Sequence, residues 1–135
     1  MSATDKVKLD GLKNTVEISR VTLNSGATRY YYEGAECSVI KAGHIVILNG
    51  TIKTKVENSF SVTLFEGVPV AIRDPNNSDI SINFGGIGHV LANDGDNYFV
   101  NIKITGGWDW VSIVPGRTLP AETYIEFWLT YITEE

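Results

Sequence analysis

The chain has 135 residues, of which 43% are hydrophobic and 20% are charged, and its net charge at pH 7 is −5. Length and composition fit one globular domain and exclude a disordered chain. The eleven Lys and Arg residues are scattered, which disfavours a nucleic-acid partner because phosphate binding needs clustered basic side chains. The sequence contains no apolar stretch long enough to span a bilayer and no signal-peptide core, so we expect no membrane insertion.

The first twelve residues predict a short helical turn. Ser2 is suited to cap its N-terminus and Gly11 to end it in a left-handed conformation. A helix this short is unstable alone in water. We therefore expect the apolar side chains of Val7 and Leu9 to dock on the following domain or on copies of the same segment. A frayed N-terminal turn is the alternative.

The rest of the chain has the pattern of an all-β protein. Apolar and polar residues alternate, and turn-forming residues recur about every ten positions. This rhythm predicts an antiparallel β-sandwich with a jelly-roll-like architecture at residues 15–135, preceded by a connector at residues 1–14. Ten strands are expected, at residues 16–23, 28–32, 36–40, 44–54, 59–65, 79–84, 89–92, 98–104, 110–114 and 123–133.

Two glycine-containing pairs affect the strand boundaries. Gly85 and Gly86 are expected to form a turn between two of these strands. Asn49 and Gly50 are typical of a two-residue hairpin turn, which would divide the strand at 44–54. We favour a continuous strand, in which Gly50 marks a bulge or a close approach of another backbone.

The last predicted strand is apolar on both faces. Its Tyr124 and Trp128 lie on the second face, where an outer strand of a monomeric sandwich should be polar. Aromatic side chains are enriched at subunit interfaces, so we expect these two residues to contact a neighbouring subunit. Exposed aromatic residues are the alternative. The first face is expected in the core and carries Ile125, Phe127, Leu129 and Tyr131.

The sequence predicts no enzymatic activity, no cofactor and no metal. His44 and His89 are far apart and lack the spacing of metal ligands. The acidic loop at 74–79 lacks the glycine and the distal glutamate of a calcium loop, and the loop at 93–97 has the pattern of a plain turn. Cys37 is the single cysteine; we expect it to be a buried, inert thiol because no partner base is evident.

The best candidate for ligand binding is the segment Trp108-Asp109-Trp110. It follows Gly106-Gly107, a strong signal for a two-residue hairpin. In an extended segment both indoles share one face and the carboxylate lies on the other. Indoles stack on the apolar faces of sugars, and carboxylates accept hydrogen bonds from sugar hydroxyls. The alternative is that Trp110 is a core residue and Trp108 covers a sheet edge.

A second candidate for ligand binding is His89 together with the loop that contains Asp94. We expect these two residues to take the role of the tryptophans if the tryptophans have no part in binding.

The N-terminal residues Met-Ser-Ala-Thr-Asp-Lys-Val-Lys-Leu-Asp-Gly-Leu resemble the segment MSAxDKxKLDGI of tail-fibre, baseplate and receptor-binding proteins of tailed bacteriophages and prophages. The likeness covers these twelve residues, with Leu12 where Ile is also common. In those proteins the segment typically precedes a β-structured head. The resemblance implies a homotrimer, contacts with other tail or baseplate proteins, and a place in the virion after assembly in the host cytoplasm.

These observations predict a receptor-binding head domain that recognises a host cell-surface polysaccharide as a homotrimer. Linked sites raise avidity, so each single site need bind only weakly. The alternative is a structural or assembly module of the tail or baseplate that binds no glycan. A depolymerase ranks third, because such activity usually needs a larger catalytic platform.

Overall fold

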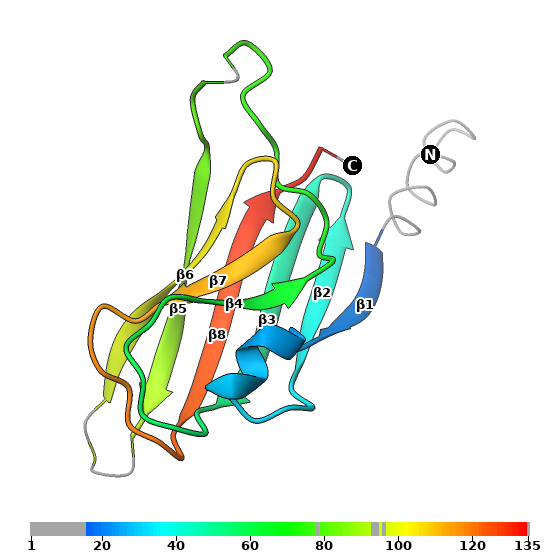
Figure 1. Cartoon of the computed structure of the whole chain (residues 1–135). Coiled ribbons are helices and arrows are strands. Elements are labelled where there is room, and N and C mark those ends of the chain that lie inside the picture. The colour runs from blue at the N-terminus through cyan, green and yellow to red at the C-terminus, as the bar shows by residue number, and fades with distance from the viewer. Residues whose placement is uncertain (1–15, 78, 93–94, 96, 135) are drawn as a thin grey trace.

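The computed structural model describes residues 16–77, 79–92, 95 and 97–134 (Figure 1). The expected helical turn with Val7 and Leu9 lies outside the described residues, as does Asp94. Within the described part of the chain, no helix has the length and hydrophobicity to cross a membrane.

The described residues form eight strands and one short 3-10 helix. In chain order they are β1 (Val16–Thr22), η1 (Ser25–Arg29), β2 (Glu36–Ala42), β3 (Ile45–Lys53), β4 (Val62–Glu66), β5 (Asn83–Leu91), β6 (Asn97–Thr105), β7 (Trp110–Val114) and β8 (Tyr124–Ile132).

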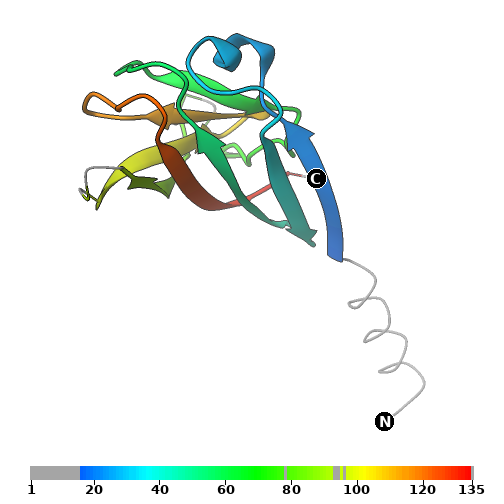
Figure 2. The same cartoon turned by 90° about the horizontal axis from the view of Figure 1, so that it is seen from below.

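All the strands pair antiparallel in a single sheet, in the order β1-β2-β3-β8-β5-β6-β7-β4. The sheet curves until its two edge strands approach each other, so it is nearly closed into a barrel-like sandwich (Figure 2). At the gap, the Asn24 N–H just after β1 donates to the Leu64 carbonyl of β4, at 2.7 Å. The predicted all-β antiparallel fold is confirmed.

The inner face of the sheet forms the core. In β8, buried and exposed residues alternate along the whole strand, and the four residues predicted for the core face are all buried. Cys37 on β2 is also buried, as predicted, and burial raises the pKa of its thiol to about 12. A thiol with that pKa stays protonated at neutral pH and is a poor nucleophile.

The prediction of a strand at residues 28–32 is wrong. Residues 25–29 instead form η1, whose first turn is capped by the Asn24 side chain, which accepts a hydrogen bond from the Gly26 N–H at 3.2 Å. Ala27 of η1 is fully buried. The end of the predicted strand is reduced to an isolated bridge between Tyr31 and Thr54, closed by backbone hydrogen bonds from the Tyr32 N–H to Lys53 and from the Lys55 N–H to Tyr30.

The expected turn at Gly85 and Gly86 is also wrong. Both glycines lie inside β5, which runs from Asn83 to Leu91, so residues 79–82 of the strand expected at 79–84 are not strand and the rest continues into the strand expected at 89–92. The continuous β3 is confirmed, with Gly50 in its interior. A Cβ on Gly50 would be 2.8 Å from the Glu36 carbonyl oxygen, so this glycine marks a close backbone approach rather than a turn.

Candidate functional site

Trp108 and Trp110 form a stacked pair of indoles on the outer face of the barrel. Their ring centroids are 4.5 Å apart and their planes are inclined by 15°. Both indoles therefore share one face, as the alternation predicted. Trp110 begins β7, and Trp108 also packs against the core cluster.

Backbone hydrogen bonds connect the segment Trp108-Asp109-Trp110 to the loop that follows β4. The Trp108 carbonyl accepts a hydrogen bond from the Ala71 N–H at 3.0 Å, and the Asp109 carbonyl accepts from the Gly67 and Val68 N–H groups at 2.9 and 3.1 Å. These bonds hold the backbone of the segment against a neighbouring loop. The indole pair is therefore a preorganised platform rather than a pair of free side chains.

The β6–β7 connection turns at Gly106 and Gly107, which confirms the predicted hairpin. The Trp108 N–H donates to the Thr105 carbonyl at 2.9 Å across this turn. A Cβ on Gly106 would be 2.4 Å from the Ile72 carbonyl oxygen, and Gly107 has φ +86°. Only glycine satisfies both positions without strain.

A mostly apolar depression with polar groups on its rim lies beside the indole pair. Its volume is about 300 Å³, and its rim combines amide and ammonium groups with apolar side chains: Asn83, Phe84, Gly85, Asn101, Ile102, Lys103 and Val114. The Lys103 Nζ is 5.9 Å from the centroid of the Trp108 ring. Lys103 therefore connects the depression with the aromatic pair.

The structure does not bring His89 to the tryptophans. The His89 imidazole stacks on the Phe99 ring, with centroids 5.1 Å apart. Phe99 and Lys103 are four residues apart on β6, which corresponds to about 13 Å along a strand. The role of the Asp109 carboxylate stays a prediction, since the contacts that fix Asp109 come from its backbone carbonyl.

A larger depression, about 480 Å³, lies on the other side of the Gly106-Gly107 turn. Its lining is Ile72, Arg73, Asp74, Pro75 and Glu134. The Arg73 Nε is 3.1 Å from Glu134 Oε1. The lining carries no aromatic ring on which a sugar could stack, so the indole pair is the better candidate for binding.

The acidic loop at 74–79 uses its oxygens for local turns. Asp74 Oδ1 accepts from the Asn76 N–H at 2.8 Å, and Asn77 Oδ1 accepts from the Asp79 N–H at 3.0 Å. Among the described residues, no group of three or more His, Cys, Asp or Glu side chains is arranged to hold a metal ion.

The outer face of the sheet also carries a large apolar surface. Tyr124 and Trp128 of β8 are exposed there, 51% and 45% respectively. Six further side chains lie in register across β1, β2, β3 and β8 and form what we call the aliphatic patch: Val16, Ile18, Ile40, Ile45, Ile47 and Ile132. The sequence predicts the two exposed aromatic residues but not the patch, because the members of the patch come from four strands.

Searches with the chain among known protein families, curated proteins and solved structures found no match. Its function is therefore argued from the site and from the N-terminal resemblance.

Proposed function

We propose that the chain is a non-enzymatic, saccharide-binding head domain. More specifically, we propose that it is the receptor-binding head of a phage or prophage tail protein, acting as a homotrimer on a host cell-surface polysaccharide. The stacked pair of Trp108 and Trp110 beside Lys103 is the observation that carries the proposal. The N-terminal resemblance supports the assignment to a phage tail.

The geometry of the indole pair suits a sugar ring. Stacking occupies one face of each indole and leaves one face of each ring outside the pair. Trp108 packs partly against the core, so we assign the sugar platform to Trp110 and a supporting role to Trp108. An aromatic face offers apolar contact to the C–H groups of a sugar ring without demanding one hydroxyl pattern.

The neighbouring depression adds the polar contacts that stacking lacks. Asn83 and Asn101 carry amides, which both donate and accept hydrogen bonds, and Lys103 carries three donors. Lys103 borders both the depression and the Trp108 ring, so we expect a sugar unit next to the stacked one to contact these groups. Shallow open sites of this kind suit a long polymer more than a small metabolite.

The apolar outer face supports self-association. A contiguous group of exposed apolar side chains on a protein surface is typical of an interaction site. The aliphatic patch and Trp128 give each subunit such a group. Three subunits in one assembly would present three saccharide sites together, which raises avidity without any new contact.

The proposal is tested on an array of immobilised bacterial polysaccharides and oligosaccharides. We expect the parent protein to bind a subset of these glycans, and Trp110→Ala to lose at least tenfold in binding with an unchanged circular dichroism spectrum. Phe99→Ala is the matched control, because Phe99 is an exposed outer-face aromatic residue away from the indole pair; it should bind like the parent. Equal binding by Trp110→Ala and the parent would overturn the site. A parent that binds no glycan would overturn the function and favour the assembly module.

A further inference from the structure

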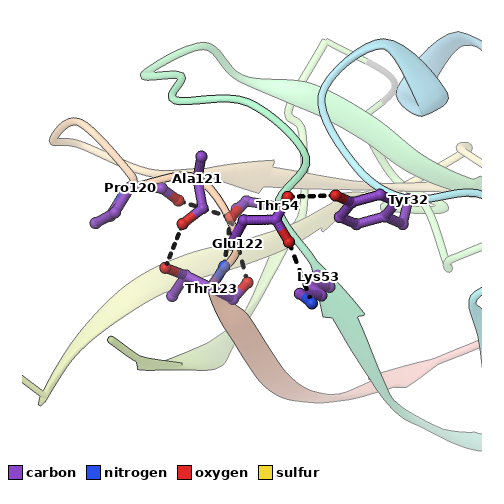
Figure 3. A network of polar contacts seen from close by, with 7 residues as sticks. All are labelled: Tyr32, Lys53, Thr54, Pro120, Ala121, Glu122 and Thr123. Carbon is purple, nitrogen blue, oxygen red and sulfur yellow. Dashed lines mark hydrogen bonds and ion pairs between the residues drawn. The ribbon is translucent and has the colours of Figure 1, made fainter. Parts of the chain in front are cut away.

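Four side chains gather near the start of β8, away from the indole pair. Lys53 of β3 is the register partner of Tyr124 on β8. The Glu122 carboxylate accepts a hydrogen bond from the Tyr32 hydroxyl and pairs with the Lys53 Nζ at 3.2 Å (Figure 3). We call these four residues, Tyr32, Lys53, Glu122 and Tyr124, the tyrosine cluster.

The tyrosine cluster places the Lys53 ammonium over two aromatic rings. The Lys53 Nζ is 5.4 Å from the centroid of the Tyr32 ring and 5.0 Å from that of Tyr124. Both tyrosines are exposed. Tyr124 lies at the opposite end of β8 from Ile132 of the aliphatic patch, so we assign its ring to this surface and not to the subunit interface expected from the sequence. The surface therefore combines two accessible rings with one ammonium donor and one carboxylate acceptor.

Glu122, which supplies the carboxylate of the tyrosine cluster, has an unusual backbone conformation. Among the described residues, Glu122 is the single non-glycine residue with positive φ, at 57°. An L-residue is disfavoured in this left-handed region. Residues held in such conformations cluster at functional sites, where the surrounding structure fixes them.

Buried Thr54 fixes this backbone conformation. The Thr54 Oγ1 donates to the Pro120 carbonyl at 2.6 Å and accepts from the Thr123 N–H at 2.9 Å. The Thr54 carbonyl also accepts from the Glu122 N–H at 3.0 Å. Figure 3 shows these bonds converging on the turn that presents Glu122. The turn is thus anchored in the interior while its carboxylate faces the exposed ring of Tyr32.

We propose that the tyrosine cluster is a second saccharide-binding site, specific for neutral sugar units. The rings of Tyr32 and Tyr124 offer stacking surfaces, Lys53 donates to sugar hydroxyls, and Glu122 accepts from them. The ligand is neutral because the charges of Lys53 and Glu122 balance each other within the site. This inference rests on the proposed function, since it assigns a second contact with the same polymer.

The two sites are too far apart for one short oligosaccharide. Tyr124 is in register with Leu91, and Leu91 with Asn97 at the start of β6. Lys103, at the indole pair, is six residues further along β6, or about 20 Å. A polymer that spans both sites gains affinity because the second contact forms within the same complex.

The test is an NMR titration of the full chain with a soluble neutral oligosaccharide, the one with the strongest signal on the glycan array. We expect two separate groups of shifted resonances, one at the backbone amides of Glu122, Thr123 and Tyr124 and one at the indole N–H groups of Trp108 and Trp110. Shifts at the indoles alone would overturn the second site and leave the proposed function standing. No shifts at either site would overturn both.

The variant Glu122→Gly separates a binding role from a structural one. Glycine adopts positive φ freely, so the variant should melt at the same temperature as the parent or higher. Binding at the tyrosine cluster should weaken at least tenfold, with the indole shifts unchanged. Glu126→Gln is the matched control, because Glu126 is an exposed carboxylate on β8 outside the cluster; it should bind like the parent.

A second variant covers the case in which Glu122→Gly disturbs the fold. Tyr124→Leu keeps an apolar side chain on an exposed strand position and removes one ring. It should also lose the shifts at residues 122 and 123 while retaining those at the indoles. Binding at the cluster that matches the parent in either folded variant would overturn the proposal.

Discussion

Gly86 of β5 lies directly against the backbone of Trp128 on β8. A Cβ at residue 86 would be 2.3 Å from the Trp128 carbonyl oxygen and 2.9 Å from the Leu129 Cα. No real Cβ tolerates the first distance, so the approach of these two strands depends on the missing side chain. The neighbouring Gly85 has open space at the same position.

Gly86→Ala should therefore destabilise the protein by about 1–3 kcal/mol, the usual cost of forcing extra volume into a packed site. Gly85→Ala, the matched control, should change stability by less than about 0.5 kcal/mol. Urea unfolding monitored by circular dichroism measures both values. Equal stability of the two variants would mean that β5 and β8 are not packed as described.

Leu129→Ala should cost about 2–5 kcal/mol, the range for deleting a buried leucine side chain. Leu129 lies on the inner face of β8 and is 1% exposed. Thr130→Ala, at the next position on the outer face, is the control and should be nearly neutral. A loss below about 0.5 kcal/mol for Leu129→Ala would contradict the assignment of the two faces.

The inner faces of the strands were predictable because alternation is a local signal. In β8, Ile125, Phe127 and Leu129 follow period two, and each is buried. The 3-10 helix η1 was not predictable in this way, since Thr28 and the tyrosines after it favour strands. The conformation of η1 is instead set by the Asn24 cap and by the burial of Ala27.

The candidate sites were only partly predictable, because alternation is a local signal and does not specify contacts between distant segments. The shared face of Trp108 and Trp110 follows from alternation between two residues that are two positions apart. The contact of Tyr32 with Glu122 joins residues 90 positions apart. Such a contact depends on the pairing of β3 with β8, which local sequence patterns do not specify.

The pair of Arg73 and Glu134 should make stability depend on pH in the acidic range. Hydrogen bonds from the Arg73 side chain and backbone N–H lower the pKa of Glu134 below its ordinary value near 4.5. A carboxyl whose pKa is lower in the folded state stabilises the fold above its unfolded pKa, and this contribution is lost as the pH falls through the folded pKa.

Glu134→Gln should thus lower the melting temperature slightly at pH 7 and leave it nearly equal to that of the parent at pH 2–3. Scanning calorimetry at several pH values measures the difference. The effect is small because Arg73 is largely exposed and water screens the pair. A difference that grows as the pH falls would contradict the assigned direction of the shift.

The aliphatic patch should hold subunits together in solution. Ile18, on edge strand β1, is 72% exposed, and a charge there would be buried without a partner in any assembly that covers the patch. Sedimentation at micromolar concentration should give the parent a mass of three chains and Ile18→Asp a mass near 14.8 kDa. Ser19→Asp, on the opposite face of β1, should sediment like the parent. A parent mass near one chain would overturn the homotrimer.

Trp128→Ala should weaken subunit association more than it perturbs the fold of each subunit. Trp128 lies in the middle of the outer face, in register with Asn49 of β3 and Ile87 of β5. Large aromatic side chains at the centre of an interface dominate its binding energy. The melting temperature of an oligomer rises with protein concentration because association stabilises the folded state by mass action. The parent and the variant should therefore differ most at nanomolar concentration and converge at high concentration. If the variant remains trimeric at nanomolar concentration with unchanged melting, Trp128 lies outside the interface.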